Sequence, residues 1–366
     1  MYQAAFELVL RGLRAHGLLK GKNLGVDCLR CASPPGQPTA GYVAVLHSSV
    51  IEANASLREL QHRNTEEAYW DYVKRLAAEA GIDPADTKAV RRFDKKRDGR
   101  KTSNKDWVNP HDTDAKVGKT KDGACDMIYK PEHITDLESG AIVRAEVRLG
   151  DEGDSEGLGG RVMEACQTLA RVCEDPEHRR TGQSLTSDEG YFSVESVCLL
   201  QGEGIRTVMG DPHRDRRRKD EPCRETRETL SRAKRAVESK SGKELLRKRG
   251  EHLERSFAHL LDHGGMRRAT LRGNENLNKR HIAAALTYNL SLLMRKLFGH
   301  GTPKQWLAAA FLRLWEAFGT LLAACGWFSA CQAGTPKAIR PELVFNKISR
   351  RYDRKIGSNS CFSTGC

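Results

Sequence analysis

Strict alternation of apolar and charged residues predicts a half-buried strand over residues 141–149. The alternating residues are Val143, Arg144, Ala145, Glu146, Val147, Arg148 and Leu149. This period of two is typical of a strand with one face in a core. Residues 124–135 form another apolar run before it, and the turn 137–140 between the two runs completes a predicted hairpin.

Shorter apolar runs predict four further strands. Residues 23–27 end in Asp27, and residues 42–51 follow after a loop rich in proline and glycine. The next strand begins at Ser184 and ends in an acid, Asp188. Ser193 then caps a helix over 194–201, and a last strand follows at 205–209. Strand, helix and strand in this order are typical of a crossover in a parallel sheet.

Apolar residues at helical spacing predict the helices. They cover residues 2–19, 66–80 with Thr65 as N-cap, 158–173, and 281–298 with Gly299 as its end. A further helix carries a stripe made of Leu246, Leu253, Phe257 and Leu260, with Glu254 beside it. The simplest explanation of this helix alone is a solvated surface with Glu–Arg pairs.

Three regions depart from these patterns. Residues 91–121 are strongly basic, which indicates an insertion that faces solvent or nucleic acid, with Trp107 in a small local core. The apolar run 306–330 contains Arg313 and Glu316, which are costly at a membrane centre, so a buried helix pair is expected there. Residues 333–366 are basic and poor in apolar residues, and we expect them to be unstructured.

The charge balance points to a polyanionic partner. The formal net charge is +13 over 366 residues, and nucleic acid is the commonest partner of such a chain. Eleven scattered cysteines favour a reducing compartment over a disulfide framework. Cys28 and Cys31 have no second Cys or His pair nearby at zinc-ligand spacing, so no metal site is expected there. No secretory signal is evident at the N-terminus.

Acidic residues at the ends of strands suggest a cation site. Asp27 and Asp188 end two predicted strands, and a helix packed on the sheet can bring Glu254 beside them. Carboxylates next to a core are costly without a partner, and a divalent cation is one remedy. Asp136 begins a predicted turn and is expected to be structural. His133 and His213 are expected to be exposed or close to phosphate rather than metal ligands.

Several motifs resemble the DDE transposases of bacterial insertion sequences. They are Asn23-Leu-Gly-Val-Asp27, Ser48-Ser-Val-Ile-Glu-Ala-Asn-Ala-Ser-Leu57, His62-Arg-Asn-Thr-Glu-Glu-Ala-Tyr-Trp70, Lys121-Asp-Gly-Ala-Cys-Asp-Met-Ile-Tyr-Lys130, Asp188-Glu-Gly-Tyr-Phe192 and His252-Leu-Glu-Arg-Ser-Phe257. The resemblance covers most of the chain from about residue 6 to residue 304. The branch that they resemble most has a Val-Asp-Ser-Ser-Val-Ile-Glu-Ala-Asn-Ala-Ser first motif.

The resemblance implies an α/β fold with an RNase H-like mixed sheet flanked by helices and a helical C-terminal region. The implied activity is metal-dependent cleavage of DNA at element ends followed by strand transfer. Asp27, Asp188 and Glu254 would hold two Mg²⁺ or Mn²⁺ ions. Double-stranded DNA is the expected partner, with a homodimer left open, no membrane, and a place at the bacterial nucleoid in the cytoplasm.

The basic residues expected to contact DNA are Arg214, Arg216, Arg217, Arg218, Lys219, Arg247, Lys248 and Arg249. The expected organisation is a remnant of an N-terminal helical region (1–22), a catalytic core (23–263) with the basic insertion 91–121, C-terminal helices (264–332) and a tail (333–366).

Three departures from the family pattern leave alternatives open. Residues 28–47 separate Asp27 from Ser48, so that His47 is the alternative occupant of the first acidic position, although imidazole is a poor Mg²⁺ ligand. Only the last helix of the usual N-terminal region is recognisable. The Tyr and Arg expected before the glutamate are Arg247 and Gly250 here. The alternatives are a truncated, inactive copy that binds DNA and a metal-independent nucleic-acid-binding protein.

Overall fold

The computed structural model describes residues 2–27, 50–98, 103–120, 124–174, 182–212 and 223–324. The chain divides into two compact units, residues 1–302 and 303–366. The sheet and the three predicted acidic ligands belong to the first unit. Residues 28–49, which include His47, and residues 213–222, which include His213 and the basic run 214–219, lie outside the described residues.

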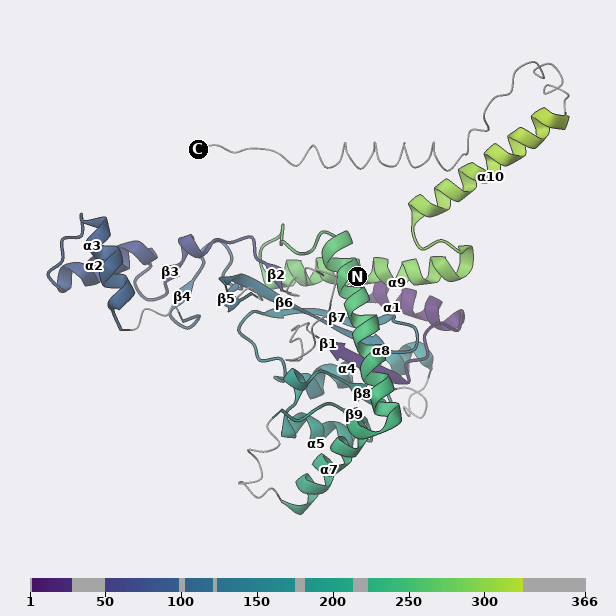
Figure 1. Cartoon of the computed structure of the whole chain (residues 1–366), viewed down its shortest axis with the longest axis horizontal. Helices are drawn as coiled ribbons and strands as arrows, with labels where there is room; N and C mark the ends of the chain where they lie inside the picture. The colour runs from purple at the N-terminus through teal and green to yellow at the C-terminus, as the bar shows by residue number, and fades with distance from the viewer. Residues whose placement is uncertain are drawn as a thin grey trace, which may run out of the picture. The chain divides into compact units, whose positions relative to one another are not determined.

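Seven strands of the described residues form one mixed sheet (Figure 1). They are β1 (Asn23–Asp27), β2 (Ile51–Glu52), β5 (Lys116–Lys119), β6 (Cys125–Asp136), β7 (Ile142–Leu149), β8 (Ser184–Thr186) and β9 (Arg206–Val208). Strand β6 pairs antiparallel with β7 and β1, whereas β1, β8 and β9 are parallel neighbours in that order. Strands β2 and β5 also pair with β6. This mixed α/β arrangement confirms the predicted RNase H-like fold.

The two faces of β1 differ because side chains alternate along a strand. Leu24 and Val26 are fully buried in the largest hydrophobic core, together with residues of the helices on that face. Gly25 faces the other way, since a methyl group added to it would lie 3.3 Å from Cγ of Arg249. Asp27 alternates with Gly25 and therefore shares the second face. The sequence of β1 thus turns its last residue, an acid, away from the main core.

Helices cover both faces of the sheet (Figure 1). The described helices of the first unit that lie outside residues 53–115 are α1 (Tyr2–Ala15), α4 (Leu158–Cys173), α5 (Val194–Gly202), α7 (Arg224–Glu238), α8 (Lys240–Phe257) and α9 (Asn274–Phe298), with short helical segments η2 (Glu189–Tyr191) and η3 (Ala258–His263). Helices α1, α4 and α5 contribute to the core on Leu24 and Val26. Helix α8 packs on the face of Gly25.

Local capping signals account for two helix starts. The hydroxyl of Ser193 accepts a hydrogen bond from the backbone N–H of Ser196 at 3.1 Å, which confirms it as the cap of α5. Ser239 caps α8 in the same way through the N–H of Gly242. The prediction for Thr65 was wrong, because its hydroxyl donates to the carboxylate of Glu67 and the helix α2 (Tyr69–Glu79) begins four residues later.

The predicted insertion 91–121 was misplaced, because its residues 116–119 form β5 and belong to the sheet. The segment between β2 and β5, residues 53–115, is the insertion in the structure and has regular structure of its own. It contains η1 (Leu57–Glu59), β3 (Gln61–His62), α2, α3 (Thr87–Lys96) and β4 (Trp107–Val108). Val73, Ala77 and Val90 form a small core between α2 and α3. Trp107 packs against the rings of His62, Tyr69 and Tyr72, as expected for a local core.

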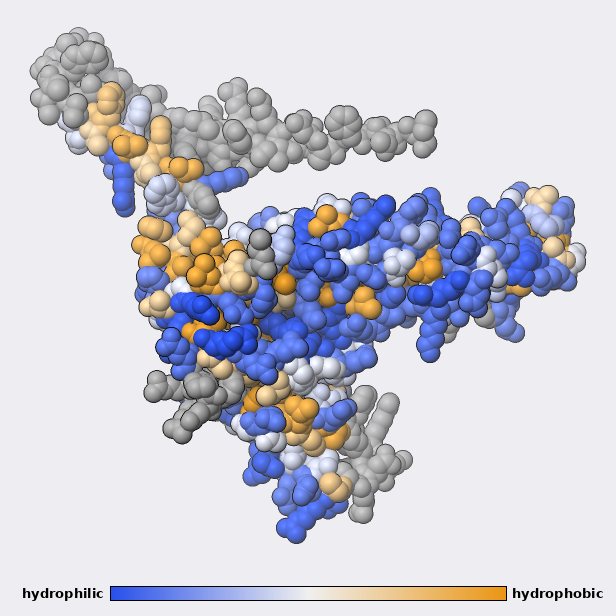
Figure 2. Space-filling model, turned by 180° about the vertical axis from the view of Figure 1, so that it is seen from behind, coloured by the Kyte–Doolittle hydropathy of each residue, from blue (hydrophilic) through white to orange (hydrophobic). Residues whose placement is uncertain are grey.

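The second unit contains α10 (Pro303–Ala324), one continuous helix where a helix pair was predicted. Large apolar side chains along it, including Phe311, Leu314 and Trp315, are exposed. Figure 2 shows hydrophobic colouring along this helix. No helix in the described part of the chain is both long and apolar enough to cross a membrane.

Candidate active site

Asp27 is a nearly buried acid at the end of the central strand. Its residue exposure is 6%, and it pairs in register with His133 on β6. The neighbouring strand on its other side is β8, which runs parallel to β1. Because parallel strands end at the same edge of a sheet, whatever follows β8 lies beside Asp27.

Asp188 follows β8 by two residues and stands at that edge. Its carboxylate is more open than that of Asp27, with 39% of the side chain exposed. Backbone hydrogen bonds hold the segment, since the N–H of Ser187 donates to the carbonyl of Val208 on β9. Asp188 then begins the short helix η2, to which its side chain gives no capping hydrogen bond. The carboxylate is therefore available for a cationic partner.

Arg249 of α8 is that partner, and it joins the two acids. Its guanidinium lies 3.3 Å from Oδ2 of Asp27 and 3.8 Å from Oδ1 of Asp188. The contact is electrostatic, because the buried Nε and Nη1 atoms of Arg249 have no hydrogen-bond partner among the described residues. Buried donors of this kind normally find an acceptor. The guanidinium thus retains donors for a further anionic or polar group.

Glu254 lies on the same helix but is exposed. Five residues separate it from Arg249, which corresponds to about 140° around the helix axis. Its carboxylate nevertheless leans back over the preceding turn, since a methyl group added to Gly250 would lie 4.0 Å from Oε1. No ion pair joins Glu254 to another of the described residues. The Glu254 carboxylate therefore has no ionic partner among the described residues and lies over the turn of α8 that contains Gly250 and Arg249.

The acids fit a divalent cation in part. Asp27 and Asp188 share one cationic group and offer the hard oxygen ligands that Mg²⁺ prefers. However, within the described ranges no group of three or more His, Cys, Asp or Glu side chains is arranged to hold a metal ion. Two of the three predicted ligands are brought together, with Arg249 between them, and Glu254 is not part of that group.

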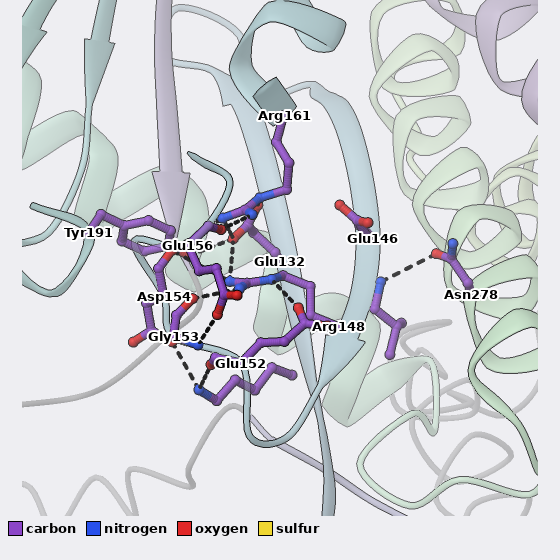
Figure 3. Close-up of polar contacts among 12 residues, drawn as sticks. Glu132, Glu146, Arg148, Glu152, Gly153, Asp154, Glu156, Arg161, Tyr191 and Asn278 are labelled. Carbon is purple, nitrogen blue, oxygen red and sulfur yellow. Dashed lines mark hydrogen bonds and ion pairs between the residues drawn. The ribbon is translucent and has the colours of Figure 1, made fainter. Parts of the chain in front are cut away.

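A buried ion network fastens the turn that carries Asp188 (Figure 3). Glu132 on β6 is 2% exposed and accepts hydrogen bonds from Arg161 of α4 at 2.7 Å, from Arg148 of β7 at 3.3 Å and from the hydroxyl of Tyr191 at 3.1 Å. Tyr191 is the last residue of η2 and lies three residues after Asp188. The network therefore ties the position of Asp188 to β6, β7 and α4.

The structure corrects the prediction for one residue of β6, His133, and adds detail to the prediction for another, Asp136. His133 is fully buried, which overturns its predicted exposure, because Ser256 and Phe257 of α8 and His281 of α9 cover it. Asp136 pairs with Leu24 at the opposite end of β1 from Asp27, about 10 Å along the strand. Burial raises the pKa of Asp136, and the Ser139 hydroxyl donates to its carboxylate. Asp136 is the last residue of β6 and directly precedes the turn 137–140, where the sequence placed it.

The basic residues of α8 divide into two kinds. Arg247 and Lys248 form exposed pairs with Glu251 and Glu244 on their own helix. Arg249 points between the two aspartates instead and is only 15% exposed. Its position could have been read from the sequence, because it lies four residues from both Leu245 and Leu253, which are buried. A charged residue within a buried stripe needs a polar partner beneath it.

Comparison with known proteins gives a family match for the segment that carries α8. No curated protein and no solved structure matches the chain. Residues 196–294, which include α8 with Arg249 and Glu254 and most of α9, match the family model of the transposase DDE domain, and this match supports a DDE transposase.

Proposed function

We propose that the chain is the DNA transposase of a bacterial insertion sequence. It cleaves phosphodiester bonds at the element ends and joins the freed 3′-hydroxyl ends to target DNA, where each replaces the 3′-oxygen of a target phosphodiester. Asp27, Asp188 and Glu254 are the proposed metal ligands, of which Glu254 lies within the matched DDE segment. The proposed partner is double-stranded DNA, and the proposed site of action is the nucleoid in the cytoplasm.

One observation carries the proposal. Asp27 and Asp188 come from distant parts of the sequence, yet both lie within ion-pair distance of Arg249. Two carboxylates that approach one point repel each other, so this edge of the sheet requires a positive charge. A divalent ion bound there would activate a water and stabilise the leaving oxygen of a phosphodiester. Asp27, Asp188 and Glu254 would hold it.

Arg249 has a second proposed role in this scheme. Once a cation neutralises the two aspartates, the guanidinium is free to turn towards the DNA backbone. Its Nε and Nη1 donors make no hydrogen bond with the described residues and suit a phosphate, which arginine binds through two parallel hydrogen bonds. Arg247 and Lys248 on the exposed side of α8, and the basic run 214–219, are the further proposed backbone contacts.

Nicking of DNA tests this function. The substrate is a supercoiled plasmid that carries the sequences flanking the chain's own gene, with Mg²⁺ present or replaced by EDTA. We expect nicking by the intact protein only with Mg²⁺, and its loss in Glu254→Gln. Glu251→Gln is the matched control, because Glu251 is an exposed glutamate of the same helix whose pairs with Arg247 and Arg255 are worth less than about 0.5 kcal/mol each.

Two results would contradict the proposal. Binding of the flanking DNA without any Mg²⁺-dependent nicking would leave a DNA-binding protein with no catalytic role. Equal nicking by Glu254→Gln and Glu251→Gln would remove Glu254 from the ligand set.

A further inference from the structure

Helix α3 of the insertion carries a continuous stripe of positive charge. Its cations are Lys88, Arg91, Arg92, Lys95 and Lys96, at spacings i, i+3, i+4, i+7 and i+8. This spacing aligns them along one side of a helix. All five are exposed. The stripe is about 12 Å long at 1.5 Å per residue.

All five cations of the stripe are unpaired among the described residues. Some exposed cations on other helices have an acidic partner one turn away, as in the pairs Arg224–Glu228, Lys234–Glu238 and Lys279–Glu275. No ion pair joins any cation of the α3 stripe to a carboxylate in the part of the chain that the structure describes. The stripe therefore presents five uncompensated charges.

The acid within α3 and the acid that caps it are already occupied. Asp94, the acid within α3, is 4% exposed and accepts hydrogen bonds from Arg97 at 2.8 Å and from the Tyr69 hydroxyl at 3.0 Å. Asp86 caps the helix by accepting from the backbone N–H groups of Lys88 and Ala89. Neither acid is free to neutralise the exposed cations.

The apolar side of α3 faces inward and offers nothing to an apolar partner. Val90 is buried against α2, and Phe93 packs on the same small core. The part of the surface in Figure 2 that contains the insertion is mainly hydrophilic. The guanidinium of Arg91 lies over the ring of Trp70 at 5.9 Å, so this aromatic is engaged by a cation. A membrane or a hydrophobic protein surface would find little to bind here, whereas a polyanion would.

We propose that the α3 stripe docks on the sugar–phosphate backbone of duplex DNA without reading its sequence. Duplex DNA carries one charge per about 1.7 Å of its axis, so a 12 Å stripe meets about seven phosphate charges, enough for five cations. The inference rests on the proposed function, since it assigns the insertion as a second DNA-binding surface of the transposase. This surface is separate from the edge of the sheet that carries Asp27 and Asp188.

Salt dependence of DNA binding tests the stripe. The full chain and the triple variant Arg91→Gln, Arg92→Gln, Lys95→Gln are titrated with a fluorescent 30-base-pair duplex of random sequence between 50 and 200 mM KCl. The slope of log K against log salt is negative, and each lost phosphate contact reduces its magnitude by about 0.9. Three lost contacts should therefore reduce the magnitude by about 2.7. The affinity at 100 mM should fall at least about tenfold.

The control changes net charge equally. Arg224→Gln, Lys234→Gln, Lys279→Gln removes three cations that have glutamate partners, and we expect the wild-type slope. Thermal unfolding of both triple variants verifies that they fold. Equal slopes for the two variants would overturn the α3 proposal alone if the intact protein still nicks its flanking DNA. A slope of smaller magnitude for the α3 variant, with no nicking by any of the proteins, supports DNA binding by the α3 stripe and overturns the proposed function. No duplex binding by the intact protein overturns both.

Discussion

The guanidinium of Arg249 lies 3.3 Å from the carboxylate of Asp27, at the end of the central strand of the sheet. The same group reaches Asp188 at the end of the next parallel strand. A cation of the protein itself therefore neutralises both acids where a divalent ion is proposed to bind. Because the buried donors Nε and Nη1 make no hydrogen bond with described residues, this contact is held by charge and is open to competition.

Replacement of Arg249 by Met should favour metal binding. Arg249→Met removes the competing charge from Asp27 and Asp188, so we expect Mn²⁺ to bind about tenfold more tightly, or about 1.4 kcal/mol. Without metal, the nearly buried Asp27 carboxylate loses a partner, which should lower the free energy of unfolding by about 1–3 kcal/mol. Calorimetric Mn²⁺ titration and urea unfolding in EDTA measure the two effects. Arg247→Met, on the exposed side of α8, is the control, and equal Mn²⁺ affinity in both variants would contradict the competition.

Loss of the Glu132 charge should strongly destabilise the fold. Glu132→Gln leaves Arg148 and Arg161 buried around a neutral group, and breaking a buried ion pair costs about 3–5 kcal/mol. Urea denaturation at neutral pH measures the loss. Because the network holds Tyr191, we also expect weaker Mn²⁺ binding at the Asp188 turn in the variant that remains folded.

The control for Glu132 lies directly opposite it on β7. Glu146 is the register partner of Glu132, but its side chain is 29% exposed and pairs with Arg144. Glu146→Gln should change the free energy of unfolding by less than about 1 kcal/mol. Similar losses for the two glutamate variants would show that the buried network adds no stability beyond an ordinary surface pair.

The elements that the sequence predicted well are those fixed by neighbouring residues. The hairpin of β6 and β7, the range of α4 and the Ser193 cap follow from local alternation, helical spacing and turn chemistry. With the acids at the ends of β1 and β8, these elements are sufficient to predict that Asp27 and Asp188 meet at one edge.

Burial of charged residues was harder to predict, because it depends on distant segments. In β7 the alternation assigns Arg148 to a polar face, yet it is 3% exposed, since α4 supplies Arg161 and covers that face. His133 is buried by residues more than a hundred positions away. The rotation of α8 is set in the same way, so that Arg249 rather than Glu254 lies against the aspartates.

Stability should decrease in mild acid because of the buried histidine pair. Burial lowers the pKa of His281 to about 4, and burial also lowers the pKa of His133. In the unfolded chain each histidine titrates near 6.5. Between pH 6.5 and pH 4 the unfolded state binds more protons, so the stabilisation is complete above pH 6.5 and decreases as the pH falls. His281 alone should account for about 3 kcal/mol over this range.

Unfolding in urea at a series of pH values measures this dependence. His281→Gln should flatten the curve between pH 6.5 and pH 4, whereas His16→Gln, at an exposed position, should leave the wild-type shape. Parallel curves for the two variants would exclude His281 as the source of the acid sensitivity.

A methyl group at Gly25 should disturb the packing beneath Arg249. The added Cβ would lie 2.5 Å from Cδ2 of Leu137 and 3.3 Å from Cγ of Arg249. Leu137 is fully buried and cannot yield without repacking, so Gly25→Ala should lower the free energy of unfolding by about 1–3 kcal/mol.

Gly160→Ala is the control, because an added methyl on this exposed helical residue meets no atom within 4 Å. It should stabilise the protein by about 0.5–1 kcal/mol. Since Arg249 must also shift in Gly25→Ala, its Mn²⁺ affinity should differ from that of Gly160→Ala. A Gly25→Ala protein with unchanged stability and Mn²⁺ affinity would mean that the contact between β1 and α8 is looser than its distances indicate.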